Sequence, residues 1–286
     1  MKLRKVFTFY FLLFVFSSIF AWCKKSVPFM KKFWGFLLVI VLMTSCGEYQ
    51  SLLKSNDYNL VYKKAIEYYN KGDYQRAMNL LDGVRSVFVG QAKAQNIAYY
   101  RAFCSYNMKD YQIASDLFKQ FIQTYPESSF AEECLYMMGF CDYKASPKPR
   151  LDQQVTEKAI REFQLYLSRY PYSMRKDKVN TYMDEMRDKL SYKAYLSAKN
   201  YYLREHYKAA VISLQNCLKD YPGSKYREEI MYMLFVSKYQ MAVNSVEDKK
   251  VERYNNAREE YYYFADEYPN SRYAADVKKM YEDIEA

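Results

Sequence analysis

Small and large apolar residues alternate at fixed distances along most of this chain. Alanine recurs at Ala77, Ala114, Ala159, Ala210 and Ala257, and four residues later a large apolar side chain follows at Leu81, Phe118, Phe163, Leu214 and Tyr261. A second small residue precedes the alanine by twelve positions in three of the five stretches, at Ala65, Ala102 and Ala198. Residues four apart share one face of a helix, so the pattern predicts amphipathic helices with small contact positions.

Small residues at facing positions allow two antiparallel helices to approach closely, while the large residues fill the space to the next pair. This is the pattern of the tetratricopeptide repeat (TPR), which also places an aromatic residue at the turn between its helices. The turn residues here are Tyr74, Tyr111 and Tyr207, and Gly72 ends the first helix. The sequence therefore predicts an all-α fold, a TPR solenoid of five helix pairs.

The tetrapeptide Tyr-Pro-x-Ser closes four of the five repeats. Its prolines are Pro126, Pro171, Pro222 and Pro269, each twelve residues after the repeat alanine, and the first repeat has Val89 there. Proline cannot continue a helix and favours an extended residue before it. The serine two residues later is a candidate N-cap for the next helix. The motif therefore predicts a helix stop followed by a helix start, and not a catalytic site.

Three segments exceed the basic repeat. Residues 145–154 in the third repeat and 245–252 in the fifth are insertions between paired helices, for which we predict loops projecting from one edge of the stack. Residues 174–203 contain no Gly or Pro, and apolar residues recur at helical spacing at Val179, Met183, Met186 and Leu190. This segment predicts one long helix.

The N-terminus carries an export signal and most of the chain's excess charge. Residues 1–45 hold seven basic residues and no acidic one, so the net charge of +10 falls to +3 for the remainder, which argues against nucleic-acid binding. Lysines, an apolar run from Phe33 to Met43 and small residues precede Cys46. This resembles the bacterial lipoprotein box, which predicts cleavage before Cys46 rather than a transmembrane anchor. We interpret Met30 as the true start of translation.

The chain offers little material for catalysis or metal binding. His206 is its one histidine, and none of its cysteines has zinc spacing. The other mature cysteines, Cys104, Cys134, Cys141 and Cys217, are expected to be buried thiols. No nucleophile, phosphate-binding glycine loop or metalloprotease motif is present, so we predict a non-enzyme without a metal or a dissociable cofactor.

Each predicted first helix carries two tyrosines seven residues apart. With the residue four after the first tyrosine, they share one helical face, here called the tyrosine ladder. One interpretation is a groove for a peptide, since tyrosine combines apolar area with a polar tip. The other is packing between successive first helices. The groove interpretation selects Tyr62, Ile66, Tyr69, Asn70, Tyr99, Phe103, Tyr106, Asn107, Tyr136, Phe140 and Tyr143.

A lipoprotein signal followed at once by five such repeats, four of them ending in Tyr-Pro-x-Ser, resembles the BamD family of the outer-membrane β-barrel assembly (BAM) machinery. The resemblance covers Cys46 to about Tyr281. It implies a lipid-anchored adaptor on the periplasmic face of the outer membrane, with diacylglycerol on the sulfur of Cys46 and an acyl chain such as palmitate on its amine. Gly47, where retained lipoproteins have Asp, is compatible with delivery to the outer membrane.

The resemblance also implies partners and a division of labour. Residues 1–45 would be a leader and 46–57 a lipidated tether. Residues 58–170, the first three repeats, would receive unfolded outer-membrane proteins, and 171–286, the last two, would dock on periplasmic domains of the barrel-forming subunit. Further lipoproteins are additional partners that the resemblance allows. The alternatives are a TPR lipoprotein that captures nutrients beside an outer-membrane transporter, or a periplasmic division or chaperone adaptor.

Overall fold

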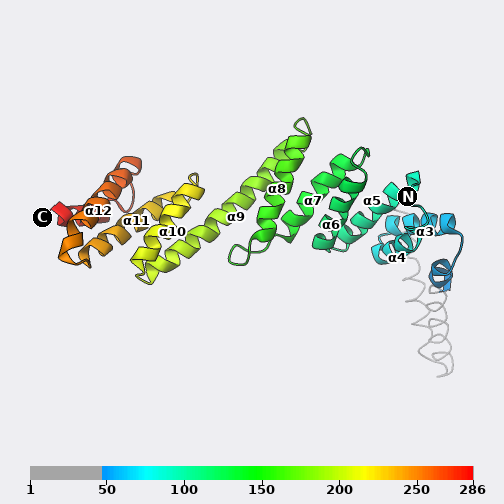
Figure 1. The fold of residues 1–286 in the computed structure, drawn as a ribbon, viewed down its shortest axis with the longest axis horizontal. Coiled ribbons are helices and arrows are strands. Elements are labelled where there is room, and N and C mark those ends of the chain that lie inside the picture. Colours follow the sequence, from blue (N-terminus) through cyan, green and yellow to red (C-terminus); the bar gives the residue numbers. More distant parts are fainter. Residues whose placement is uncertain (1–46, 286) are drawn as a thin grey trace, which may run out of the picture. The chain divides into compact units, whose positions relative to one another are not determined.

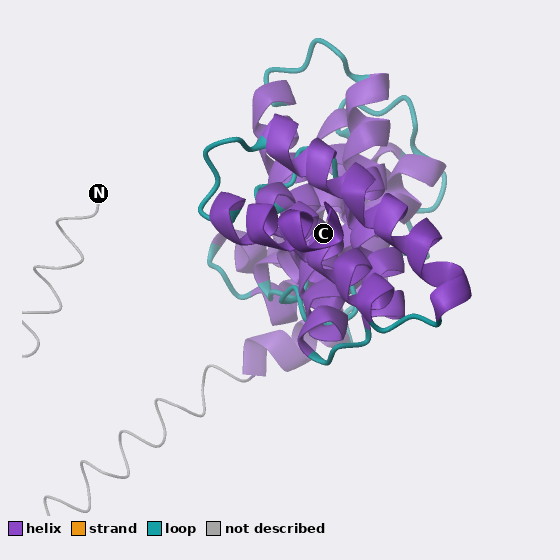
Figure 2. Ribbon diagram, turned by 90° about the vertical axis from the view of Figure 1, so that its left-hand side faces the viewer, coloured by secondary structure: helices purple, strands orange, loops and turns teal. Residues whose placement is uncertain are grey.

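The computed structural model describes residues 47–285, so the predicted leader and the acylated Cys46 lie outside the described residues. Within this range the chain is all helix and turn, with no strand (Figure 2). The predicted all-α class is therefore confirmed. The chain divides into two compact units, Met1–Val87 and Phe88–Ala286.

The first unit pairs α3 (Tyr58–Asn70) with α4 (Tyr74–Val84). Asp57 and Asp73 cap the two helices, and Gly72 takes a positive φ of 83° in the turn between them. A further helix over residues 47–53 precedes the pair and buries Tyr49 and Leu52. The predicted tether thus begins with an ordered helix whose side chains join the core of this unit.

The second unit follows the chain as a row of helices (Figure 1). In order they are α5 (Ala92–Asn107), α6 (Tyr111–Thr124), α7 (Ala131–Ala145), α8 (Gln154–Arg169), α9 (Lys176–Leu203), α10 (Tyr207–Asp220), α11 (Arg227–Val243), α12 (Glu247–Glu267) and α13 (Ala274–Glu285). Within the row, the pairs are α5–α6, α7–α8, α9–α10 and α11–α12, and α13 packs on α11 and α12. With α3–α4, these make the five predicted helix pairs.

The repeat alanines lie at the contacts between paired helices. Ala77, Ala114, Ala159, Ala210 and Ala257 are all fully buried, as are Ala65, Ala102 and Ala198. The long helix predicted for 174–203 is α9, which begins two residues later at Lys176. All four cysteines of the repeats are buried thiols. Burial raises the pKa of Cys134 to about 12 and of Cys217 to about 11, so these thiols are poor nucleophiles, as expected.

The Tyr-Pro-x-Ser turns stop and start helices as predicted, but the serine is not the N-cap. The N-cap of α7 is Phe130, two residues after Ser128, and α9 and α11 repeat this offset. The serine hydroxyl instead accepts the N–H of that N-cap residue, at 3.2 Å for Ser128. Its carbonyl accepts the first helical N–H, so one serine sets two consecutive turns.

The first insertion does not project freely. Gln153 is buried and donates to the carbonyls of Lys148 and Leu151 at 2.8 and 3.1 Å. From α9, Lys193 reaches the Leu151 carbonyl at 2.8 Å, and Lys189 reaches Ser146 at 2.6 Å. The predicted loop is confirmed, since residues 146–153 lie outside any helix. It does not stand free of the stack, because its polar residues close hydrogen bonds among themselves and with α9.

The second insertion is a helix. Residues 247–252, predicted as part of a loop, form the first turns of α12. The helices α4, α6 and α10 start at a position of the repeat that corresponds to Tyr254. The helix α12 starts seven residues before that position. Glu247 and Asp248 stand in its first turn, where carboxylates favour helix initiation. The loop prediction failed here because a charged stretch without Gly or Pro extends a helix readily.

A charged cluster is buried between α6, α7 and α8. The side chains of Asp142 and Glu162 are only 2% and 10% exposed, and Lys158 lies 2.8 Å from Asp142 and 3.7 Å from Glu162. Ser115 donates to Asp142 at 3.0 Å, and Asp116 lies 3.9 Å from Lys158. One oxygen of Glu162 has no hydrogen-bond partner among the described residues. Burial, together with the neighbouring Asp142, raises the pKa of Glu162 well above the usual carboxyl range.

Replacing Glu162 with glutamine is expected to raise stability at alkaline pH. Because the folded-state pKa of Glu162 exceeds its unfolded value, the folded chain holds more protons, and its stability falls as pH rises between the two values. The variant lacks this loss, so its advantage should grow with pH and reach about 1–3 kcal/mol. Urea unfolding from pH 5 to 9 measures this, and parallel pH profiles for the two proteins would contradict it.

Candidate peptide-binding surface

The predicted groove residues fall in both compact units. In the first unit, α3 carries Tyr62, Ile66 and Tyr69, all half-buried, with Asn70 exposed at the end of the helix. The Tyr69 ring makes an edge contact with Tyr74 across the turn, with 5.5 Å between ring centroids. These α3 residues form one face of the helix, as the spacing predicts.

In the second unit, the ladder rings of α5 and α7 form one continuous aromatic cluster. Tyr99 and Phe103 lie 4.5 Å apart between ring centroids, and Tyr106 joins Phe140 across the two helices at 6.2 Å. Phe140 in turn contacts Tyr136 and Tyr143 at 5.6 and 5.9 Å, and Asn107 ends α5 half-buried. The six predicted aromatic residues of this unit are therefore brought together, and only Asn107 lies outside the ring cluster. The six rings pack on the core of the unit, and most of them are half-exposed.

In the four repeats after the first, one ring face of the first ladder tyrosine is covered. The covering side chain lies two residues after the motif serine, directly before the next helix. Phe130 lies 4.6 Å from Tyr99, Tyr226 lies 4.4 Å from Tyr195, and the guanidinium of Arg175 lies 4.7 Å from the ring of Tyr136. The Tyr232–Tyr273 pair repeats this stacking at 4.1 Å. These contacts join successive first helices.

The ladder hydroxyls reach carboxylates on the following first helix. Tyr99 donates to Glu133 at 2.8 Å, and Tyr195 donates to Glu229 at 2.9 Å. The remaining pairs are Tyr143–Glu185, Tyr232–Asp276 and Tyr239–Asp283, at 2.5, 2.6 and 3.3 Å. The ladder thus includes the packing role considered from the sequence. Whether its exposed edges also bind a peptide stays a prediction.

Electrostatics keep these phenols protonated. The hydrogen bond to Glu185, with burial, raises the pKa of Tyr143 to about 12. Burial raises the pKa of Tyr136 and of Tyr106 as well. The ladder hydroxyls are therefore neutral hydrogen-bond donors at physiological pH, suited to recognition and not to nucleophilic chemistry.

Several residues of this surface were missed from the sequence. Tyr182 of α9 stacks on Tyr143 at 4.4 Å and contacts Phe140 at 5.5 Å, extending the cluster by one helix. The N-cap aromatics and the first-turn carboxylates were also missed. Their signal was available, because tyrosine and glutamate stand 34 positions apart in both Tyr99–Glu133 and Tyr195–Glu229.

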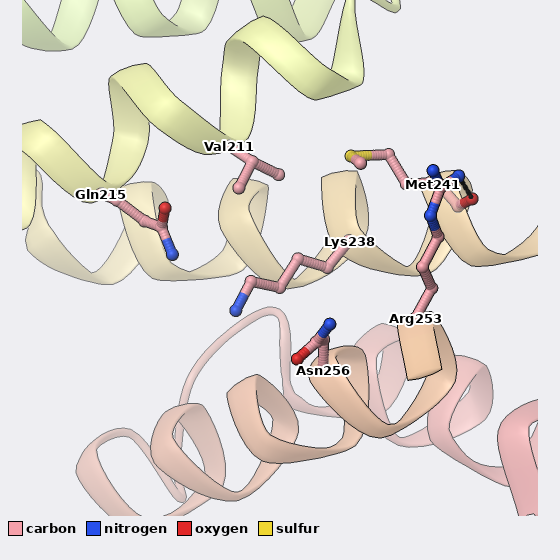
Figure 3. A pocket seen from close by; sticks show the side chains of 6 residues that line it. All are labelled: Val211, Gln215, Lys238, Met241, Arg253 and Asn256. Carbon is pink, nitrogen blue, oxygen red and sulfur yellow. Dashed lines mark hydrogen bonds between the residues drawn. The ribbon is translucent and has the colours of Figure 1, made fainter. Parts of the chain in front are cut away.

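A separate cleft lies in the predicted docking region, between α10, α11 and α12. Figure 3 shows its lining: Val211 and Gln215 from α10, Lys238 and Met241 from α11, and Arg253 and Asn256 from α12. Its volume is about 230 Å³, and a neighbouring opening of about 640 Å³ shares Met241 and Arg253. Arg253 donates to the Met241 carbonyl at 3.2 Å and to Ser245 at 2.6 Å, which ties the start of α12 to the end of α11.

Comparison with protein families gives one match across nearly all of the described chain. The sequence model of the outer membrane lipoprotein family YfiO matches residues 54–229 and again 193–286. The chain belongs to the YfiO family of outer membrane lipoproteins. This confirms the resemblance inferred from the repeats, since YfiO is the BamD family. Comparison with curated protein sequences gives no match.

Three solved structures similar to this YfiO-family chain are a TPR repeats protein from Bacteroides fragilis NCTC 9343, the TPR2AB domain of yeast Sti1 with pHSP90, and a human IFIT1 dimer with PPP-AAAA. In the same order, their sequence identities to this chain are 12%, 11% and 16%, and their TM-scores are 0.39, 0.36 and 0.28. The alignments cover 81%, 80% and 79% of this chain, and 99%, 98% and 57% of the other chains.

Membership of YfiO associates the chain with the outer membrane. Among the helices of residues 47–285, none is long and apolar enough to cross a membrane.

Proposed function

We propose that the chain is a non-catalytic, lipid-anchored adaptor of the outer-membrane β-barrel assembly machinery. Its anchor is the acylated Cys46, and it faces the periplasm. It receives unfolded outer-membrane proteins and docks on the barrel-forming subunit for their insertion. The observation that carries the proposal is membership of the YfiO outer membrane lipoprotein family over residues 54–286.

The client side of this proposal is the ladder of residues 58–170. The half-exposed rings of Phe103, Tyr106 and Phe140 offer apolar edges, and the phenol of Tyr106 offers a neutral donor. Aromatic side chains and backbone carbonyls of an unfolded chain match such a surface. Successive helices stand about 9–10 Å apart, whereas same-face residues of an extended strand recur about every 6.8 Å. Recognition is therefore tolerant of sequence.

The docking side of the proposal is the region from Lys193 to Glu285. The cleft between α10, α11 and α12 lies in this region, and its lining combines Val211 and Met241 with Arg253 and with Lys238, which is ion-paired to Glu260 at 2.6 Å. The same region exposes Val246, the N-cap of α12, and Val251 in its extra turns, which are 68% and 72% exposed. Apolar residues next to the guanidinium of Arg253 suit a folded partner domain with an acidic rim.

Replacing the ladder tyrosines of the first two repeats with alanine is expected to reduce crosslinking to an unfolded barrel protein by roughly tenfold, or about 1.4 kcal/mol of binding free energy. The reason is loss of the aromatic edges on the client side, together with the hydroxyl of Tyr106. Site-specific photocrosslinking measures the effect, with helicity followed by circular dichroism. The replaced residues are Tyr62, Tyr69, Tyr99 and Tyr106.

The matched control replaces the equivalent tyrosines of the last two repeats. These side chains have the same spacing, and Tyr195 and Tyr232 make the same stacking and carboxylate contacts as Tyr99. If both variants lose crosslinking equally and lose helicity together, the ladder is packing alone. The control residues are Tyr195, Tyr202, Tyr232 and Tyr239.

Depletion of the protein tests the function as a whole. Barrel proteins should disappear from the outer membrane, and the tagged chain should copurify with the barrel-forming subunit. Copurification with a nutrient transporter or with division proteins, together with normal barrel levels, would instead support one of the alternative adaptors.

A further inference from the structure

The four Tyr-Pro-x-Ser turns share one backbone conformation, but their exposed side chains differ. The two positions that flank the motif serine are exposed in every turn. In three turns these positions hold polar residues or glycine: Glu127 and Ser129, Gly223 and Lys225, Asn270 and Arg272. In the turn between α8 and α9 they hold Tyr172 and Met174, which are 98% and 103% exposed.

The same turn also differs in charge. Residues 169–178 contain four basic side chains and one acidic side chain, a balance of +3. The equivalent stretches have balances of −3 for 124–133, −1 for 220–229 and −1 for 267–276. Arg169, Lys176 and Lys178 are exposed around the turn. Apolar character and positive charge therefore coincide at a single turn.

The base of this turn is fixed, so the exposure of its tip is a defined feature. Ser173, between the two apolar residues, donates to Glu132 at 2.8 Å, and Tyr166 reaches the same carboxylate at 3.0 Å. Arg175 lies over the ring of Tyr136 and 3.6 Å from Glu133. Because Ser173 is held inward, Tyr172 and Met174 project outward on either side of it.

We propose that this turn, residues 169–178, is a second membrane contact that inserts Tyr172 and Met174 into the interfacial region of an anionic lipid surface. Tyrosine favours the headgroup region, and Met174 supplies flexible apolar length. Arg169, Lys176 and Lys178 form a cationic collar that pairs with lipid phosphates.

A lipid surface fits the turn better than a protein partner does. A stable protein interface buries about 800 Å² on each side, far more than two side chains at a convex tip supply. Membrane contact needs only a small inserted tip when the chain is already tethered, because the tether raises its effective concentration at the surface. The inference uses the proposed anchor at Cys46 and goes beyond the adaptor role.

Tryptophan fluorescence can report on this contact, because residues 46–286 contain no native tryptophan. The chain's two tryptophans, Trp22 and Trp34, both precede Cys46. In the full chain with Trp22→Phe and Trp34→Phe, the substitution Tyr172→Trp places one fluorophore at the tip. The matched control is Asn270→Trp, at the equivalent position of the last turn. Both proteins are reconstituted in vesicles of brominated phosphatidylcholine and phosphatidylglycerol.

Bromine should quench the Tyr172→Trp reporter several-fold more than the Asn270→Trp control and shift its emission to the blue. Adding Lys176→Glu and Lys178→Glu, or replacing phosphatidylglycerol with phosphatidylcholine, should remove most of the difference. Equal quenching at the two positions, or solvent-exposed emission at both, would show that the turn faces water or protein and would overturn the proposal. Barrel-protein levels after depletion report on the adaptor function separately.

Discussion

Replacing Lys158 with methionine is expected to lower the free energy of unfolding by about 2–4 kcal/mol at pH 8. The lysine is the cation of the cluster between α6, α7 and α8, where Asp142 and Glu162 are 2% and 10% exposed. Without it, two buried carboxylates repel each other with no compensating charge in the cluster. The expected loss is below that for a fully buried pair because the Lys158 side chain is itself 36% exposed.

The matched control for this experiment is Lys250→Met. Lys250 forms an ion pair of 2.6 Å with Glu247, whose side chain is 83% exposed, so solvent screens the pair and its loss should leave stability nearly unchanged. Lowering the pH should relieve the Lys158 variant selectively, because protonation removes the repulsion. Adding Glu162→Gln should restore part of the loss. Equal effects of Lys158→Met and Lys250→Met in urea unfolding would contradict this account.

This cluster could not have been predicted from the sequence. Asp142, Lys158 and Glu162 lie on two helices separated by an insertion, and Ser115 comes from a third. Sequence spacing shows which residues share a face of one helix, but not which faces meet after an insertion of unknown shape. Charged residues on helices are usually solvated, so nothing in the sequence marks these three as buried together.

The helix pairs themselves were predictable because one physical requirement repeats. Close approach of two helices needs small residues, and the turn before the next pair needs a proline stop, so alanine and Tyr-Pro-x-Ser recur in register. The insertions broke that register and were both interpreted as loops. One is closed by Gln153, and the other lengthens α12, because each outcome depends on local hydrogen bonding and helix propensity rather than on the repeat.

The candidate surface was predictable in its rings but not in its partners. The spacing of Tyr99, Phe103 and Tyr106 placed them on one face, and the structure joins them to Phe140. The contact of the Phe130 ring with Tyr99 depends on the serine turn that precedes α7. No single-helix period describes this three-dimensional arrangement.

The third repeat also has a small residue in its first helix, Gly139. Because of the insertion, Gly139 does not lie twelve positions before the repeat alanine Ala159. Measured from the first ladder tyrosine, the small residue comes three positions later in four repeats: Ala65, Ala102, Gly139 and Ala198. At Gly139 an added Cβ would lie 2.8 Å from a ring carbon of Phe163, the large residue of the paired helix α8. Real Cβ atoms do not approach carbon so closely, and Phe163 is fully buried.

Replacing Gly139 with valine is therefore expected to destabilise the chain by roughly 2–3 kcal/mol, because overpacking forces the Phe163 ring or α8 to move. Urea unfolding followed by circular dichroism measures the change. The matched control is Gly83→Val in α4, where an added Cβ meets nothing within 4 Å. Valine exceeds glycine slightly in helix propensity, so the control should be neutral or stabilising by about 0.3 kcal/mol.

A double variant separates overpacking from other causes. The first and fourth repeats combine alanine with leucine at these two positions, Ala65 with Leu81 and Ala198 with Leu214. Adding Phe163→Leu to Gly139→Val should recover at least about 1 kcal/mol relative to the sum of the single changes, because the smaller side chain vacates the space that valine needs. Strict additivity, or equal losses for Gly139→Val and Gly83→Val, would show that helix propensity and not the Phe163 contact sets the requirement for glycine at this position.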